Sequence, residues 1–197
     1  MDKGQVKLMN ADEDIKIFDP ERDEKLEERR TDDDLRRLAD EMMAQRRNGN
    51  SRRACLLGSA LSQLAPCDGE LEALSGKYAN DPEILYQIRV LATFTAESGM
   101  HALIPNQLLA TTAINAFYEK LMVRAPEFYS NISDGGAFTF YYLELRKGGN
   151  TGANIGKAFA MLCDMETNEQ IRALGTQIYE TFSEYVKRQI DAAGFVR

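Results

Sequence analysis

Near the C-terminus of this chain, apolar residues recur every three or four positions. The run consists of Ile171, Leu174, Ile178, Phe182 and Tyr185. This spacing places all five side chains on one face of an α-helix. Thr167 or Asn168 precedes the run as a capping residue, and Gly194 follows it, in the positions where helices commonly begin and end. The sequence therefore predicts a long amphipathic helix over residues 168–194.

The same spacing, divided by helix starts and stops, recurs along most of the chain. It predicts a helical arm over residues 20–48, helices over residues 51–64, 82–98, 105–124, 126–131, 137–147 and 155–164, and a short one between Leu71 and Tyr78. We expect Thr31 to cap a fresh helix and Gly99 to end a helix. Residues 137–147 also have strand propensity, but they lie between helices and no partner strand is evident in the sequence, so we expect a helix there.

These elements predict an all-α fold, an irregular single-domain bundle of about seven or eight helices with a charged helical N-terminal arm. Phe18 is the only aromatic residue before position 54, so the core must come from later residues. We expect residues 1–19 to be a flexible or strapped-down segment, 20–48 to be the charged helical arm, and 49–197 to be the core domain. The arm carries a narrow apolar stripe, formed by Leu35, Leu38, Met42 and Met43. Such a stripe suits the edge of a core or a partner helix.

The charge and the hydropathy exclude some classes of partner. The formal net charge is −7, whereas nucleic-acid binding usually requires a basic surface and anionic membranes attract one. No run approaches the ~18 apolar residues that span a bilayer. Three cysteines without a close pair make a poor disulfide framework, and the N-terminus has no apolar signal region. We therefore expect a cytoplasmic protein that does not bind membranes, with nucleic acid an unlikely partner.

The sequence contains no recognisable catalytic set. His101 is the only histidine, and Glu97 precedes it by four positions. That pair could share a metal, but di-iron bundles need two Glu-x-x-His motifs and two further glutamates, which one histidine cannot supply. No Gly-x-Ser-x-Gly nucleophile motif is present either. We expect no metal, no cofactor and no catalytic residue, and we interpret the chain as non-enzymatic.

A glycine-rich loop over residues 148–157 is the best candidate for a ligand site. Glycines precede a predicted helix there, and free N–H groups at a helix N-terminus bind anions. The candidate ligand-binding residues are Gly149, Asn150, Thr151, Gly152, Asn154 and Lys157. The spacing of Gly152, Gly156 and Lys157 departs from the P-loop, and Ala158 replaces its Ser or Thr. We favour an ordinary connection between two helices, with a phosphate or carboxylate site as the alternative.

Two other groups of residues are candidates for an interaction surface. Arg46, Arg47, Arg52 and Arg53 flank the turn Asn48–Asn50 and could grip phosphates or acidic side chains, although pairing within the charged arm is the favoured interpretation. Aromatic residues are concentrated between positions 117 and 142, where they could line a pocket but more simply form the core. Phe140, Tyr141 and Tyr142 are consecutive and cannot all face inward on one helix. Tyr141 and Tyr142 are therefore included in the candidate surface.

The helical pattern resembles that of many bacterial proteins, a general likeness that gives no residue a role. We expect a non-catalytic helical protein that acts through a homo-oligomer, such as a homodimer, or through a protein partner. The alternatives are an anionic-ligand-binding protein or enzyme that uses residues 148–157, and nucleic-acid binding through the arginines at 46–53.

Overall fold

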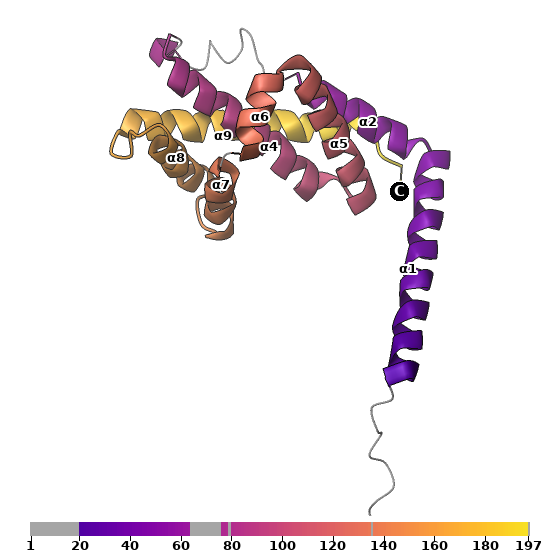
Figure 1. The fold of residues 1–197 in the computed structure, drawn as a ribbon. Helices are drawn as coiled ribbons and strands as arrows, with labels where there is room; N and C mark the ends of the chain where they lie inside the picture. The colour runs from indigo at the N-terminus through magenta and orange to yellow at the C-terminus, as the bar shows by residue number, and fades with distance from the viewer. Residues whose placement is uncertain (1–19, 64–75, 79, 135, 197) are drawn as a thin grey trace, which may run out of the picture. The chain divides into compact units, whose positions relative to one another are not determined.

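The protein is all-α. The structure, a computed structural model, describes residues 20–63, 76–78, 80–134 and 136–196. Within these residues there is no strand, and the predicted helical bundle is confirmed, including a helix within 137–147 (Figure 1). The elements are α1 (Pro20–Arg47), α2 (Asn50–Leu61), the 3-10 helix η1 (Gly76–Tyr78), α4 (Pro82–Leu103), α5 (Gln107–Arg124), α6 (Pro126–Asp134), α7 (Ala137–Arg146), α8 (Thr151–Leu162) and α9 (Glu169–Ala193). The segment 1–19 and the helix expected near Leu71 lie outside the described residues.

The chain divides into two compact units, Met1–Met43 and Ala44–Arg197. The first contains most of α1. This helix runs through Thr31 without interruption, so the expectation that Thr31 caps a fresh helix is wrong. The acidic residues that follow Thr31 instead pair within the continuing helix, as Asp33 with Arg36 and Asp34 with Arg37, at 3.9 Å each. Pairs spaced three apart on an exposed helix stabilise it by only a few tenths of a kcal/mol, about 0.2–0.5.

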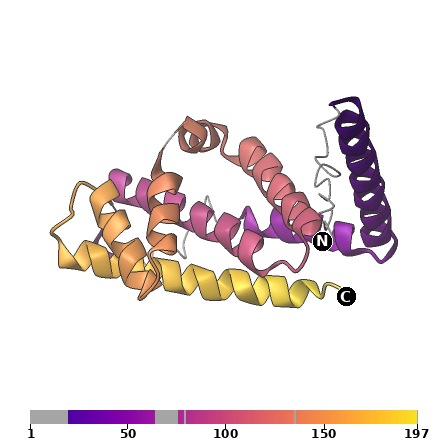
Figure 2. The ribbon, with the colours of Figure 1, turned by 90° about the horizontal axis from the view of Figure 1, so that it is seen from below.

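Helix α4 contains the longest continuous run of buried residues in the described part of the second unit. All seven residues from Val90 to Ala96 are buried. Seven residues make almost two helical turns, so neighbours cover every side of α4 at this level. Helix α9 packs along α4, and α8 packs on α9 (Figure 2). Helices α2 and α5 form a second tightly packed pair.

Asparagine or aspartate side chains cap the N-termini of four of these helices. Asp81, Asn106, Asn150 and Asn168 accept hydrogen bonds from backbone N–H groups in the first turns of α4, α5, α8 and α9. This is the usual role of a capping residue. The predicted helix starts at Asp81 and Asn168 agree with the structure. Helix α8 begins at Thr151, earlier than the predicted residue 155, because Asn150 caps it.

The prediction that Gly99 ends a helix is wrong, because α4 continues through it to Leu103. Gly99 instead provides room for α9, since a Cβ atom at this position would lie 2.7 Å from Cγ1 of Val186. Helix α4 ends before Ile104, whose extended backbone is the conformation favoured before a proline such as Pro105.

Candidate functional site

The apolar stripe on α1 is exposed in the structure. The exposed fractions are 62% for Leu35, 41% for Leu38, and 56% for both Met42 and Met43. Leu35, Leu38 and Met42 are spaced three and four positions apart, which aligns them along one face of the helix. Single exposed apolar side chains are ordinary on a protein surface, but three large ones aligned on one face, with Met43 beside them, are typical of a helix that packs on another helix.

The C-terminal end of α1 is held by a network centred on Asn50, which is fully buried. The side-chain amide of Asn50 donates to Oε1 of Gln45 at 2.8 Å and to the carbonyl of Val196 at 2.7 Å. In return, the backbone N–H of Val196 donates to Oδ1 of Asn50 at 2.9 Å. Gly49 has φ of 80°, a left-handed conformation suited to glycine, and allows the chain to turn from α1 into α2. The network therefore joins the last turn of α1 to the segment after α9.

The four arginines of the predicted surface do not act as one group. Arg53 lies partly buried and donates from Nη1 to the carbonyl of Asn48 at 2.9 Å and to Oδ1 of Asn50 at 3.2 Å. Arg53 thus stabilises the turn between α1 and α2. Arg46, Arg47 and Arg52 are exposed. That these three bind a partner stays a prediction.

The glycine-rich loop has a packing role in the structure. Gly152 and Gly156 lie inside α8 and face α9, where a Cβ on Gly156 would lie 2.4 Å from the carbonyl oxygen of Arg172. Both glycines therefore allow the two helices to approach closely. Oδ1 of Asn150 accepts a hydrogen bond from the N–H of Ala153 at 3.0 Å. This N–H group of the first turn of α8 is therefore already occupied.

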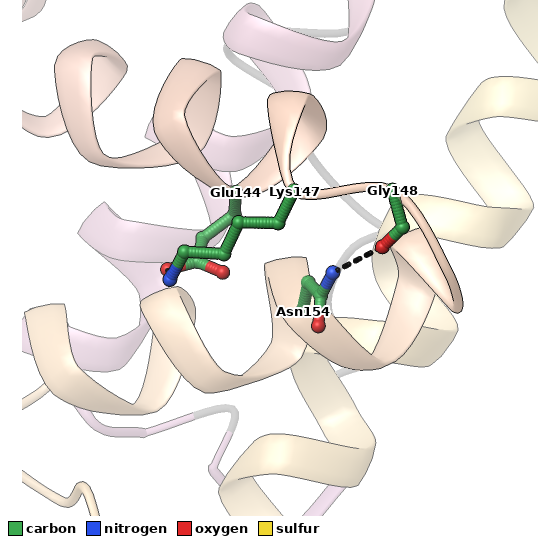
Figure 3. Close-up of polar contacts among 4 residues, drawn as sticks. All are labelled: Glu144, Lys147, Gly148 and Asn154. Carbon is green, nitrogen blue, oxygen red and sulfur yellow. Dashed lines mark hydrogen bonds and ion pairs between the residues drawn. The ribbon is translucent and has the colours of Figure 1, made fainter.

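The side chains beside the loop also contact one another. Asn154 donates to the carbonyl of Gly148 at 3.0 Å, and Lys147 forms an ion pair with Glu144 (Figure 3). Gly149 has φ of 74°, which is why glycine suits this position. Thr151 is partly buried and Lys157 is exposed. The glycines and the capping contacts thus have structural roles of their own. An anion site at this loop stays a prediction.

The three consecutive aromatic residues of α7 face different surroundings, as helix geometry requires. Phe140 is 44% exposed, Tyr141 is fully buried, and Tyr142 is partly buried. Tyr141 and Tyr142 both pack on Phe94 of α4, each with ring centroids 5.0 Å apart. The hydroxyl of Tyr141 is buried without a hydrogen-bond partner among the described residues. Its burial raises the pKa of this phenol.

A polar cluster that no sequence pattern predicted lies where α4, α5 and α7 meet. Glu97 of α4 accepts hydrogen bonds from the hydroxyls of Tyr118 on α5 and Tyr142 on α7; the second measures 2.8 Å. All three residues are partly buried. One sequence feature could have indicated this cluster. Glu97 lies seven residues after Val90 and three after Phe94, both buried, so a charged residue interrupts an apolar stripe on one face of the helix.

The same cluster changes the acidity of its phenols. Burial is the main reason that the pKa of Tyr118 lies above its ordinary value, and the negative charge and hydrogen bond of Glu97 raise it further. Burial, followed by the hydrogen bond and charge of Glu97, also raises the pKa of Tyr142. Both phenols therefore stay protonated at neutral pH and act as donors to the carboxylate.

Comparison of the chain with protein-family models, with curated proteins and with solved structures finds no match. In the part of the chain that the structure describes, no group of three or more histidine, cysteine, aspartate or glutamate residues is arranged to hold a metal ion. No described helix has the length and apolar character needed to cross a membrane.

Proposed function

We propose that this protein acts without catalysis, through self-association in which a second copy of the chain packs on the α1 stripe. The observation that carries this proposal is the exposure of Leu35, Leu38, Met42 and Met43 along one helix. Burying a large aliphatic side chain contributes about 1.5–3 kcal/mol, and these four are roughly half exposed. A partner helix that covers them gains several kcal/mol.

The spacing and charge of α1 favour a second copy as that partner. Leu35, Leu38 and Met42 have the alternating three and four spacing of a seam between two helices. Residues 32–47 contain five acidic and four basic residues, a net charge of −1, whereas the whole chain carries −7. Two copies of this helix therefore meet with little mutual repulsion.

The anchored end of α1 supports the same proposal. The hydrogen bonds among Gln45, Asn50 and Val196 hold the turn that follows the stripe. A segment that is already helical loses less conformational freedom on association than an unfolded one, which makes binding less costly. Pairing of α1 with a second α1 would thus join two copies of the chain without a conformational change in residues 44–197 of either copy.

Sedimentation velocity over a wide concentration range, from about 5 to 500 μM, tests the proposal, because a short seam supports only modest affinity. The test variant is Leu38→Gln with Met42→Gln, since glutamine keeps helix propensity and removes the apolar surface. The matched control is Leu56→Gln, which alters an exposed leucine on α2 (61%) that lies outside the stripe. We expect a wild-type dimer, a control that still dimerises, and a double variant whose dissociation constant rises by about two orders of magnitude.

Two results would contradict the proposal. The first is a wild-type protein that stays monomeric over the whole range. The second is a wild-type dimer whose dissociation constant is the same in the double variant as in Leu56→Gln, since the stripe would then lie outside the interface.

A further inference from the structure

We propose that Glu97, Tyr118 and Tyr142 form a binding site for an organic ammonium ion. The three residues come from α4, α5 and α7, and the two phenols donate to opposite oxygens of the Glu97 carboxylate. Within the described residues, Glu97 takes part in no ion pair. A partly buried carboxylate without a cation is the feature that a positively charged ligand would complete.

The hydrogen bonds of Glu97 leave its carboxylate able to accept more. An ionised carboxylate has about four acceptor positions, and the two phenols use two of them. The remaining positions retain their attraction for a positive charge, which grows as water is excluded. A charge taken partly out of water is unfavourable unless it is paired, and an ammonium ion supplies that pairing.

Further aromatic rings pack against the two tyrosines that donate to the carboxylate. Tyr142 packs edge-on against Phe94 at 5.0 Å, and Tyr118 packs edge-on against Phe117 at 5.1 Å and Tyr129 at 6.0 Å. The face of an aromatic ring is negative, so it attracts a cation within about 6 Å. Rings and a single carboxylate suit an alkylammonium group better than a metal ion, which requires several oxygen or nitrogen ligands.

The basic side chains close in sequence form no ion pair with Glu97 among the described residues. Lys120 lies two residues after Tyr118, His101 lies one turn after Glu97, and Arg146 lies one turn after Tyr142. All three are exposed. The cation is therefore expected to come from outside the chain.

Isothermal titration calorimetry with choline chloride, at constant ionic strength, tests this site in the full-length protein. The neutral isostere 3,3-dimethylbutan-1-ol has the same shape without the charge, so we expect it to bind at least about tenfold more weakly. We expect Glu97→Gln to weaken choline binding by a similar factor. The matched control is Glu119→Gln, which removes an exposed carboxylate one residue after Tyr118 and should leave binding unchanged.

The comparison of choline with its neutral isostere uses only the wild-type protein, so it remains decisive if Glu97→Gln does not fold. Absence of choline binding up to about 20 mM, a range that covers even very weak sites, would overturn the proposal. So would equal binding of choline and the alcohol, or equal choline binding by wild type and a folded Glu97→Gln variant. In each case the cluster would serve only to brace three helices.

Discussion

Gly58 is the position where one added carbon should most disturb the fold. It lies on the face of α2 that packs against α5, and a Cβ atom there would lie 1.9 Å from the carbonyl oxygen of Ala113 and 2.8 Å from its carbonyl carbon. Both atoms belong to backbone in the middle of a helix and cannot swing aside. The two helices must separate by more than about 1 Å before the contact becomes tolerable.

The expected loss of stability follows from two opposing effects. Overpacking a well-packed site lowers stability by about 1–3 kcal/mol. Because the new Cβ of Gly58→Ala meets helix backbone that cannot move aside, we expect a loss at or above the upper end of that range. Replacing a helical glycine by alanine returns about 0.8–1.0 kcal/mol through helix propensity. We therefore expect the free energy of unfolding to fall by about 2 kcal/mol. For a chain of this length, that lowers Tm by about 4–8 °C.

Urea unfolding followed by circular dichroism at 25 °C, with Tm from the same signal, measures this effect. The matched control is Gly99→Ala, also within a helix, where the new Cβ would lie 2.7 Å from Cγ1 of Val186 and meets side-chain atoms, not backbone. Val186 is buried and β-branched, so this contact also lowers stability, but a side chain yields more than a helix backbone. We therefore expect a loss of about 1 kcal/mol, smaller than for Gly58→Ala. If Gly58→Ala were as stable as the wild type, or more stable than Gly99→Ala, the close approach of α2 and α5 would be refuted.

Three further predictions address the loop, the α1 anchor and the phenols. Gly156→Ala should lower the free energy of unfolding by about 2 kcal/mol because α8 and α9 must separate, whereas Lys157→Ala at an exposed site should change it by less than about 0.5 kcal/mol in urea. Asn50→Ala should lower it by about 2–3 kcal/mol by removing the hydrogen bonds of this buried side chain, and should accelerate amide hydrogen exchange at Val196. Because folding raises the pKa of Tyr142 above its ordinary value near 10, the stabilisation is complete below pH 10 and is lost as the pH rises further. Alkaline urea titrations of Tyr142→Phe should show a smaller decline than the wild type, and an identical decline would contradict the assigned cause.

Features that depend on neighbours along the chain could be predicted from the sequence. The start of α9 at Asn168 and the start of α4 at Asp81 depend on side chains that bond within the next three residues. The divergent surroundings of Phe140 and Tyr141 follow from the 100° turn between successive helical residues. The all-α class follows from the same local rules.

Features that depend on distant segments were decided only by the tertiary structure. Gly99 and Gly156 look like helix punctuation in sequence, but each is small because another helix passes close to it. Glu97 is paired with tyrosines 21 and 45 positions away, and no local pattern specifies such partners. Local hydrogen bonds and periodicity thus set where the helices lie along the chain. Their close approaches, the Asn50 anchor and the Glu97 cluster depend on which helix faces meet, and that is settled by packing over the whole core.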